Sequence, residues 1–125
     1  MTPADRKYTK EHEWIQVEGN TAKVGISFHA QEALGDIVFV ELPAVGDSFE
    51  RGDSIAVVES VKAVSNIYTS VAGKIVEVNE ALDAQPELLN EDPYANFIAA
   101  FEISSIAEED LMSASEYDAF VAAGA

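Results

Sequence analysis

Apolar and polar residues alternate along several short segments of the chain, and this two-residue period is typical of β-strands with one buried face. Residues 14–18 and 21–26 alternate in this way on either side of Gly19 and Asn20, a pair that favours a tight hairpin turn. Residues 74–79 alternate again. We therefore predict a hairpin near the start of the chain and a further strand at 74–79.

A fourth segment, residues 36–42, is rich in β-branched and aromatic residues and predicts another strand. Strict alternation predicts two faces, which are occupied by Val38, Val40 and Leu42 and by Ile37, Phe39 and Glu41. Pro43 would end this strand, because proline has no N–H group to donate to a neighbouring strand.

The pattern around Lys62 predicts a second hairpin, with the lysine near its tip. Two segments rich in β-branched residues, 52–59 and 64–71, flank the short stretch that contains Lys62. Gly52 lies ten residues before the lysine and Gly73 lies eleven residues after it. We expect both glycines to adopt positive φ where the chain reverses. For a lysine taken alone, simple solvation would be the expected role.

Other segments predict short helices. Ser27 is a suitable N-cap, and Gly35 a suitable C-terminal residue, for a helix between them. Residues 86–90 are compatible with one helical turn, and residues 97–103 predict another strand.

The C-terminal region predicts a terminal helix. Either Ser105 or Ser113 would serve as an N-cap, and Gly124 would end the last helix. The apolar face of this region is formed by Leu111, Tyr117, Phe120 and Val121.

Short strands joined by tight turns indicate a mainly β sandwich or partly closed barrel with helices added. A length of 125 residues is typical of one domain, and we expect residues 1–125 to form a single domain. The 48% hydrophobic content supplies material for a core.

The formal net charge of −16 changes the functional picture. Nucleic-acid binding is disfavoured, because phosphates require a basic surface. The acidic surface could steer the chain towards basic docking faces on partner proteins. An acidic proteome or a need for solubility would explain the same charge, and the sequence leaves these readings open.

The sequence shows no cysteine, no membrane span and no recognisable targeting segment. The chain has no cysteine, which excludes a disulfide framework, thiol catalysis and thiolate metal sites. No apolar run approaches the roughly 20 residues of a membrane span. Residues 1–7 show neither the apolar stretch of a signal peptide nor an arginine-rich transit helix. We expect a cytoplasmic protein that is monomeric and does not bind membranes.

No catalytic motif is recognisable. His12 and His29 are the two histidines, and they lack the spacing of a metal-binding pair. Ser60 has no nucleophile elbow around it, and the glycines form no phosphate-binding loop. We expect neither an enzyme nor a metal site.

Four blocks of sequence resemble the H protein of the glycine cleavage system. They are YTKEHEW at 8–14, the run from GISFHAQEALGD to FVELP at 25–43, ESVKAV at 59–64 and PELLNEDPY at 86–94. The blocks occur in the family order and spacing over nearly the whole chain. The resemblance implies a lipoyl-domain-like barrel-sandwich hybrid of antiparallel sheets with short helices and a C-terminal helix.

The same resemblance implies roles for three residues. Lys62 would carry lipoate in amide linkage as N6-lipoyllysine, and Glu59 would be read by the modifying enzyme. Glu13 would contact the loaded lipoyl arm in a surface cleft, whereas without the resemblance it would be taken as a solvent-exposed residue before a strand.

The implied function is that of a carrier. Lipoylated Lys62 would accept an aminomethyl group from a pyridoxal-phosphate glycine decarboxylase, the P protein. It would deliver this group to a tetrahydrofolate-dependent aminomethyltransferase, the T protein, and be reoxidised by dihydrolipoamide dehydrogenase, the L protein. A lipoate ligase or lipoyltransferase would attach the arm.

Two positions depart from the family pattern. Asn66 stands where many relatives have an acidic residue, so its contact with the amine is in doubt. The segment 95–103 lacks the glycine, tryptophan and basic charge usual in the family, so partner contacts there would differ.

Four alternatives remain open at this stage. A biotinyl carrier would have methionine on both sides of its lysine, where this chain has Val61 and Ala63. A lipoyl domain of an acyltransferase would lack the Glu-His-Glu-Trp opening that precedes residue 15. A lipoate-relay homologue, which donates lipoyl groups to other proteins, fits the same residues, and an unmodified interaction module is the fourth reading.

Overall fold

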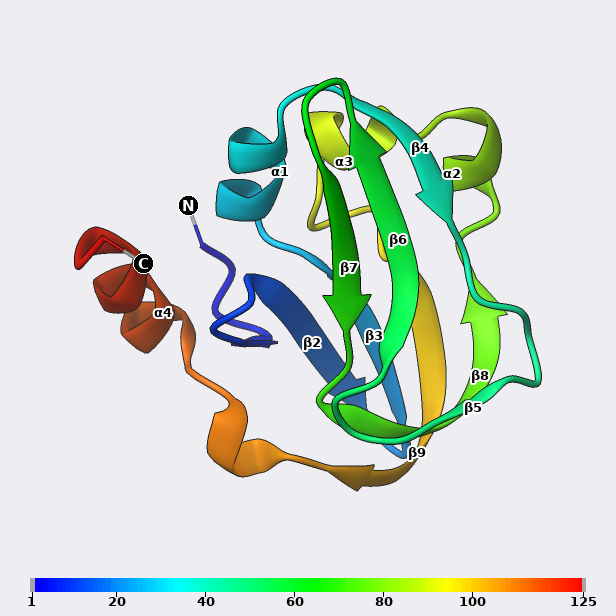
Figure 1. Ribbon diagram of the computed structural model, residues 1–125. Helices are drawn as coiled ribbons and strands as arrows, with labels where there is room; N and C mark the ends of the chain where they lie inside the picture. The colour runs from blue at the N-terminus through cyan, green and yellow to red at the C-terminus, as the bar shows by residue number, and fades with distance from the viewer. Residues whose placement is uncertain (1, 125) are drawn as a thin grey trace.

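The computed structural model describes residues 2–124, which form two antiparallel sheets with short helices at their margins (Figure 1). The strands are β1 (Lys7–Tyr8), β2 (Glu13–Glu18), β3 (Thr21–Ile26), β4 (Ile37–Glu41), β5 (Ser48–Phe49), β6 (Ser54–Ser60), β7 (Val64–Tyr68), β8 (Val71–Val78) and β9 (Ala99–Ile106). The helices are α1 (Phe28–Leu34), α2 (Ala81–Ala84), α3 (Leu88–Glu91), the 3₁₀ turn η1 (Glu108–Asp110) and α4 (Ala114–Ala122). The predicted mainly β fold with short helices and a C-terminal helix is confirmed.

The strands form one sheet of six and one sheet of three. The six-stranded sheet has the order β1-β2-β3-β9-β8-β5, and the three-stranded sheet has the order β4-β6-β7. Figure 1 shows β6 and β7 in front of β2, β3 and β9. The two hairpins predicted from the sequence, β2–β3 and β6–β7, are both present, with Glu18 opposite Thr21 and Glu59 opposite Val64.

The main core lies between the two sheets. Val24 and Ile75 of the larger sheet and Val40 and Val58 of the smaller one are at most 2% exposed and belong to one apolar cluster. Because a sheet must bury its apolar face against another element, this layer holds the two sheets together. The β6–β7 hairpin is therefore carried on a well-packed base.

A second cluster ties the N-terminal strands to the C-terminal helix. Tyr8, Trp14 and Tyr117 are at most 2% exposed, and the rings of Tyr8 and Tyr117 stack with their centroids 4.8 Å apart. The guanidinium carbon of Arg6 lies 4.5 Å from the centroid of the Trp14 ring. This cluster places α4 against the loop that precedes β2.

The predicted faces of β4 are wrong, because a β-bulge interrupts the strand. Ile37 pairs with Ser60 and Phe39 pairs with Glu59, so Val38 is an extra residue between two consecutive pairs. A bulge resets the alternation of side chains. As a result Ile37 and Val40 both point into the core, at 2% exposure each, whereas Val38 is 55% exposed.

The expectation for the two glycines that flank the hairpin holds for one of them. Gly52 has φ +93° in the turn before β6. Gly73 has no positive φ and lies inside β8, where the register against β9 shifts. A Cβ at residue 73 would come within 2.0 Å of the carbonyl oxygen of Glu102, so glycine is required here for close approach of two backbones.

In the C-terminal third, the bounds of the strand differ from the predicted bounds, and the structure decides between the two candidate N-caps. The strand expected at 97–103 is β9, which begins at Ala99 and extends to Ile106. Ser113 is the N-cap of α4, and Ser105 lies within β9. Within residues 2–124, no helix has the length and apolar character needed to cross a membrane.

Candidate functional site

Lys62 lies at the tip of the β6–β7 hairpin, in a turn that Ser60 closes. The backbone N–H of Ser60 donates to the carbonyl of Ala63 at 2.8 Å. The Ser60 hydroxyl oxygen accepts from the N–H groups of Lys62, at 3.3 Å, and Ala63, at 3.0 Å. These contacts show that the role of Ser60 is to order the turn.

The turn is also tied to the loop between α1 and β4. The N–H of Val61 donates to the carbonyl of Asp36 at 3.0 Å. The side chain of Asn90, on α3, donates to the carbonyl of Gly35 at 2.8 Å and accepts from the N–H of Ile37 at 2.9 Å. The backbone around Lys62 is thus held by two neighbouring elements, although no sequence signal marked Asn90 for this role.

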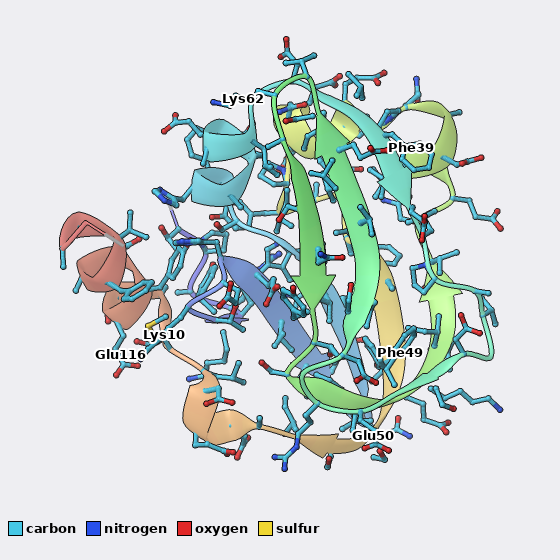
Figure 2. All side chains as sticks on the ribbon, viewed as in Figure 1. Lys10, Phe39, Phe49, Glu50, Lys62 and Glu116 are labelled. Atoms are coloured by element: carbon cyan, nitrogen blue, oxygen red, sulfur yellow. The ribbon has the colours of Figure 1, made fainter. Side chains whose placement is uncertain are left out.

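The side chain of Lys62 is exposed and leans towards α1 (Figure 2). Its Cε lies 3.5 Å from the position that a Cβ on Gly35 would occupy. Its Nζ makes no hydrogen bond or ion pair with any residue from 2 to 124. The amine is therefore an accessible group on an ordered backbone, and no neighbouring carboxylate has to be displaced before it reacts.

Glu59 lies three residues before Lys62 on β6 and is half-buried. It stands opposite Phe39 of β4 and opposite Val64 of β7. The structure places it on the same hairpin as Lys62, on the central strand of the three-stranded sheet.

Glu13 is buried, which differs from the solvent-exposed position that its neighbours alone would indicate. Only 3% of the residue is exposed. One carboxylate oxygen accepts from the hydroxyl of Thr9 at 2.9 Å, and the other accepts from the N–H of Tyr68 at 2.8 Å. Tyr68 ends β7, so this carboxylate joins the edge of the smaller sheet to β2 of the larger one.

The environment of Glu13 raises the pKa of its carboxyl group. Burial raises the pKa of this carboxyl to about 7, against the opposing effect of the hydrogen bonds from Tyr68 and Thr9. Removing a carboxylate from water disfavours its charged form. A cation placed beside Glu13 would restore the charged form.

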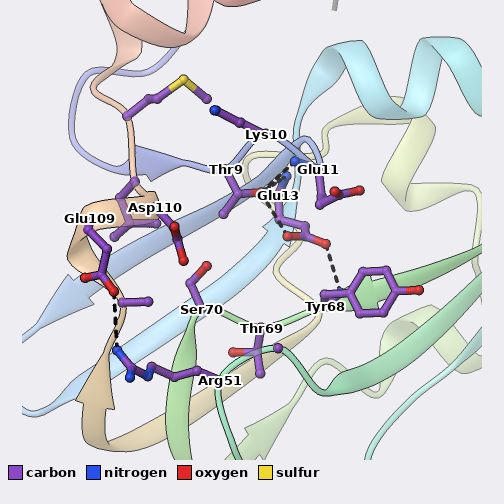
Figure 3. Close-up of a pocket in the computed structure, with 14 residues that line it drawn as sticks. Thr9, Lys10, Glu11, Glu13, Arg51, Tyr68, Thr69, Ser70, Glu109 and Asp110 are labelled. Carbon is purple, nitrogen blue, oxygen red and sulfur yellow. Dashed lines mark hydrogen bonds and ion pairs between the residues drawn. The ribbon is translucent and has the colours of Figure 1, made fainter.

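Glu13 lines a cavity of about 860 Å³ (Figure 3). The walls come from the loop before β2, the turn before β6, the turn between β7 and β8, and the segment from Ala107 to Met112. Arg51 and Glu109 form an ion pair of 3.6 Å at its wall. Its lining carries four carboxyl groups and two cationic groups. The carboxyl groups belong to Glu11, Glu13, Glu109 and Asp110, and the cationic groups belong to Lys10 and Arg51. The carboxyl groups therefore outnumber the cationic groups in this lining.

The two histidines lie beside the loop that carries Glu13. His12 has φ +68°, and its ring centroid lies 4.5 Å from that of His29. Its Nδ1 shares a hydrogen bond of 2.8 Å with the hydroxyl of Tyr117, and burial lowers its pKa. The same hydroxyl shares a hydrogen bond of 2.7 Å with Ser27, the N-cap of α1. These contacts position the loop that carries Glu13.

The described residues combine two chemical features. One is an exposed primary amine at the tip of an ordered hairpin, and the other is an acidic cavity at the far end of β7. Within residues 2–124, no group of three or more metal-binding side chains comes together. An exposed amine on an ordered hairpin, supported by two packed antiparallel sheets, is an arrangement suited to a carrier protein that presents a covalently attached group.

Comparison with known proteins agrees with this class. The family model for the glycine cleavage H-protein matches residues 6–124. A glycine cleavage system H protein from Symbiobacterium thermophilum is 54% identical over 124 residues, which are 98% of this chain and 97% of the relative. One from Alkaliphilus oremlandii is 55% identical over 120 residues, 95% of this chain and 94% of the relative.

The fold agrees as well. The crystal structure of a glycine cleavage system H protein from Mycobacterium marinum superposes with a TM-score of 0.90 at 40% identity, covering 96% of this chain and 98% of that one. The chain therefore belongs to the glycine cleavage H-protein family, and it is a lipoyl carrier rather than an enzyme. Members of this family carry lipoate covalently attached to a lysine.

Proposed function

We propose that Lys62 is the lysine that carries lipoate. The observation that supports this best is its position, because its amine is exposed and unpaired at the tip of a hairpin whose backbone is held by Ser60 and Asp36. Amide formation at Nζ removes the positive charge and extends the side chain without disturbing the core. The turn then keeps the point of attachment in place while the arm moves.

Family membership implies work with the other components of the glycine cleavage system. Attached to Lys62, the lipoyl group would supply a disulfide that takes up the aminomethyl group left when the P protein removes carbon dioxide from glycine. The T protein would transfer this group from the reduced arm to tetrahydrofolate with release of ammonia, and the L protein would reoxidise the arm. The chain's own contribution is tethering, which raises the effective concentration of one reactive group at three active sites. We place this activity in the cytoplasm, and in a monomer that forms one domain over residues 1–125.

Glu13 is the candidate contact for the loaded arm. It lines the cavity at the end of β7, the strand that begins at the Lys62 turn. An ammonium group beside the buried carboxylate would pair with it and lower its pKa from about 7. The cavity walls would also shield the arm from water. Asn66, on the same strand, is neutral and adds no charge to this contact.

The amine assignment is tested by replacing Lys62 with arginine. Lys62→Arg retains the charge and approximate size but removes the acylable amine, so we expect a folded protein with no carrier activity in a reconstituted glycine cleavage assay. Lys74→Arg, at an exposed lysine on β8, is the matched control and is expected to keep full activity. Full activity of Lys62→Arg would refute the assignment.

A further inference from the structure

The outer face of the three-stranded sheet carries exposed apolar side chains close to Lys62. Phe39 is 42% exposed, Val64 is 64% exposed, and the bulge residue Val38 is 55% exposed. Val61, next to Lys62 in the turn, is 70% exposed. The proposed role of Lys62 uses none of these side chains, and the core does not enclose them.

The strand register places these residues in an ordered row. Val40 pairs with Val58, and Val58 pairs with Ser65, and the two valines point into the core. One residue along, Phe39 pairs with Glu59 and Glu59 with Val64, so these three point to the opposite, outer side. At a strand spacing of about 4.8 Å, the row Phe39–Glu59–Val64 extends roughly 10 Å across the sheet.

The row combines apolar flanks with a central carboxylate. Glu59 is half-buried between Phe39 and Val64, and the next outward row adds Glu41, opposite Val57. No ion pair within residues 2–124 involves Glu59 or Glu41. A partner that covered this face would remove water from Glu59, and a desolvated carboxylate needs a cation. The complementary surface is therefore apolar with a positively charged side chain at its centre.

The bulge contributes to this surface. Without the extra residue, Val38 would not stand beside Phe39 on the exposed side of β4. Bulges re-aim side chains, and they are common next to functional sites. Exposed apolar side chains that gather around a reactive group indicate a contact surface, whereas Val17 and Val76 are exposed on separate strands of the other sheet.

We infer that the outer face formed by Phe39, Glu59 and Val64 is the docking surface for the enzyme that acylates Lys62, and that this enzyme places an apolar patch with a central arginine or lysine on it. The inference rests on the proposed attachment of lipoate to Lys62 and extends it from the single residue Glu59 to a row across three strands. The acylating enzyme is the occupant because it must select this one lysine, and the row is joined to the Lys62 turn by strands β6 and β7 (Figure 2).

The test is the rate of lipoylation by a purified lipoate ligase acting on the unmodified full chain. Phe39→Gln, Val64→Thr and the double variant are compared with Val17→Thr and Val76→Thr, which make the same valine change on exposed positions of the larger sheet. We expect kcat/KM to fall by about tenfold or more in the double variant, as for loss of an interface hot spot, and to stay unchanged in the two controls. Unchanged melting temperatures would show that the docking variants fold.

A second arm tests the central carboxylate. Glu59→Gln is expected to lower kcat/KM and to weaken its dependence on ionic strength, because the lost interaction is between charges. A wild-type kcat/KM for the double variant overturns the inferred docking surface. An equal loss of kcat/KM in the Val17→Thr and Val76→Thr controls overturns it as well. So does a wild-type dimer in sedimentation that the Phe39 change dissociates, because the occupant would then be a second copy of the chain. Failure of the wild type to be lipoylated at Lys62 would instead refute the proposed function.

Discussion

At the residue scale, Lys62 and Glu13 differ in how far the sequence could predict their surroundings. The turn around Lys62 is local, because it is closed by hydrogen bonds within residues 60–63. Glu13 is buried through Tyr68, which lies 55 residues further along the chain. A carboxylate in a run of polar residues gives no sign of such a partner. The assignments of Lys62, Glu59 and Glu13 to lipoyl chemistry stay predictions.

Glu13 makes the stability of the protein depend on pH. Its pKa is raised from an ordinary 4.5 to about 7 in the folded chain. The folded state therefore binds a proton more tightly than the unfolded state, so this contribution is present in full below pH 4.5 and is lost as the pH rises through 7. Between about pH 5 and pH 7.5, ionisation of Glu13 should cost about 2 kcal/mol of unfolding free energy.

Glu13→Gln isolates this effect. The amide keeps the shape of the side chain and does not ionise, so urea unfolding of the variant should lack this part of the pH dependence. The wild type should lose about 2 kcal/mol relative to the variant from pH 5 to pH 7.5. Parallel profiles for the two proteins would contradict the raised pKa.

At the element scale, features set by neighbouring residues could be predicted from the sequence, whereas features set by contacts between distant strands could not. The Gly19-Asn20 hairpin and the Ser27 cap of α1 were predicted from short patterns and are confirmed. The bulge at Val38 was not foreseeable, because it depends on how β4 aligns with β6 across the sheet. The prediction of a positive φ at Gly73 is wrong for a similar reason. Glycine is required at this position because the backbone of Glu102, on another strand, approaches it closely.

Helix α4 offers a test of a local signal. The hydroxyl of Ser113 accepts from the N–H of Glu116 at 3.2 Å, and the Glu116 carboxylate accepts from the N–H of Ser113 at 2.9 Å. This reciprocal arrangement is a capping box, and it lowers the pKa of the Glu116 carboxyl. Ser113→Ala should reduce the unfolding free energy by about 1 kcal/mol.

Ser105→Ala is the control for that change, because Ser105 is exposed within β9 and caps no helix. Its effect in urea unfolding should stay below about 0.5 kcal/mol. Equal effects of the two substitutions would show that the capping box does not stabilise α4.

At the scale of the whole molecule, the net charge of −16 is the dominant electrostatic feature. Within residues 2–124 there are two ion pairs, Arg6–Asp5 and Arg51–Glu109. Most of the 23 acidic residues therefore have no cationic partner, and self-repulsion should outweigh attraction between charges. Such repulsion favours expanded states.

Added salt should therefore stabilise the protein. The Debye length falls from about 30 Å at 0.01 M to about 10 Å at 0.1 M salt, which screens repulsion across a molecule of this size. We expect the melting temperature to rise by several degrees between these two salt concentrations. A decrease would mean that attractive pairs dominate. The same experiment with uncharged sucrose separates screening from general exclusion effects.

The carrier assignment combines evidence from all three scales: a turn that presents one amine, a hairpin that two packed sheets support, and a fold shared with the H protein of Mycobacterium marinum. The most direct test of its central claim is intact mass with peptide mapping, applied to the chain after expression in a host that lipoylates a control H protein. We predict one lipoyl adduct, located on Lys62. Absence of any adduct, or an adduct on another lysine, would contradict the assignment of Lys62 as the attachment site.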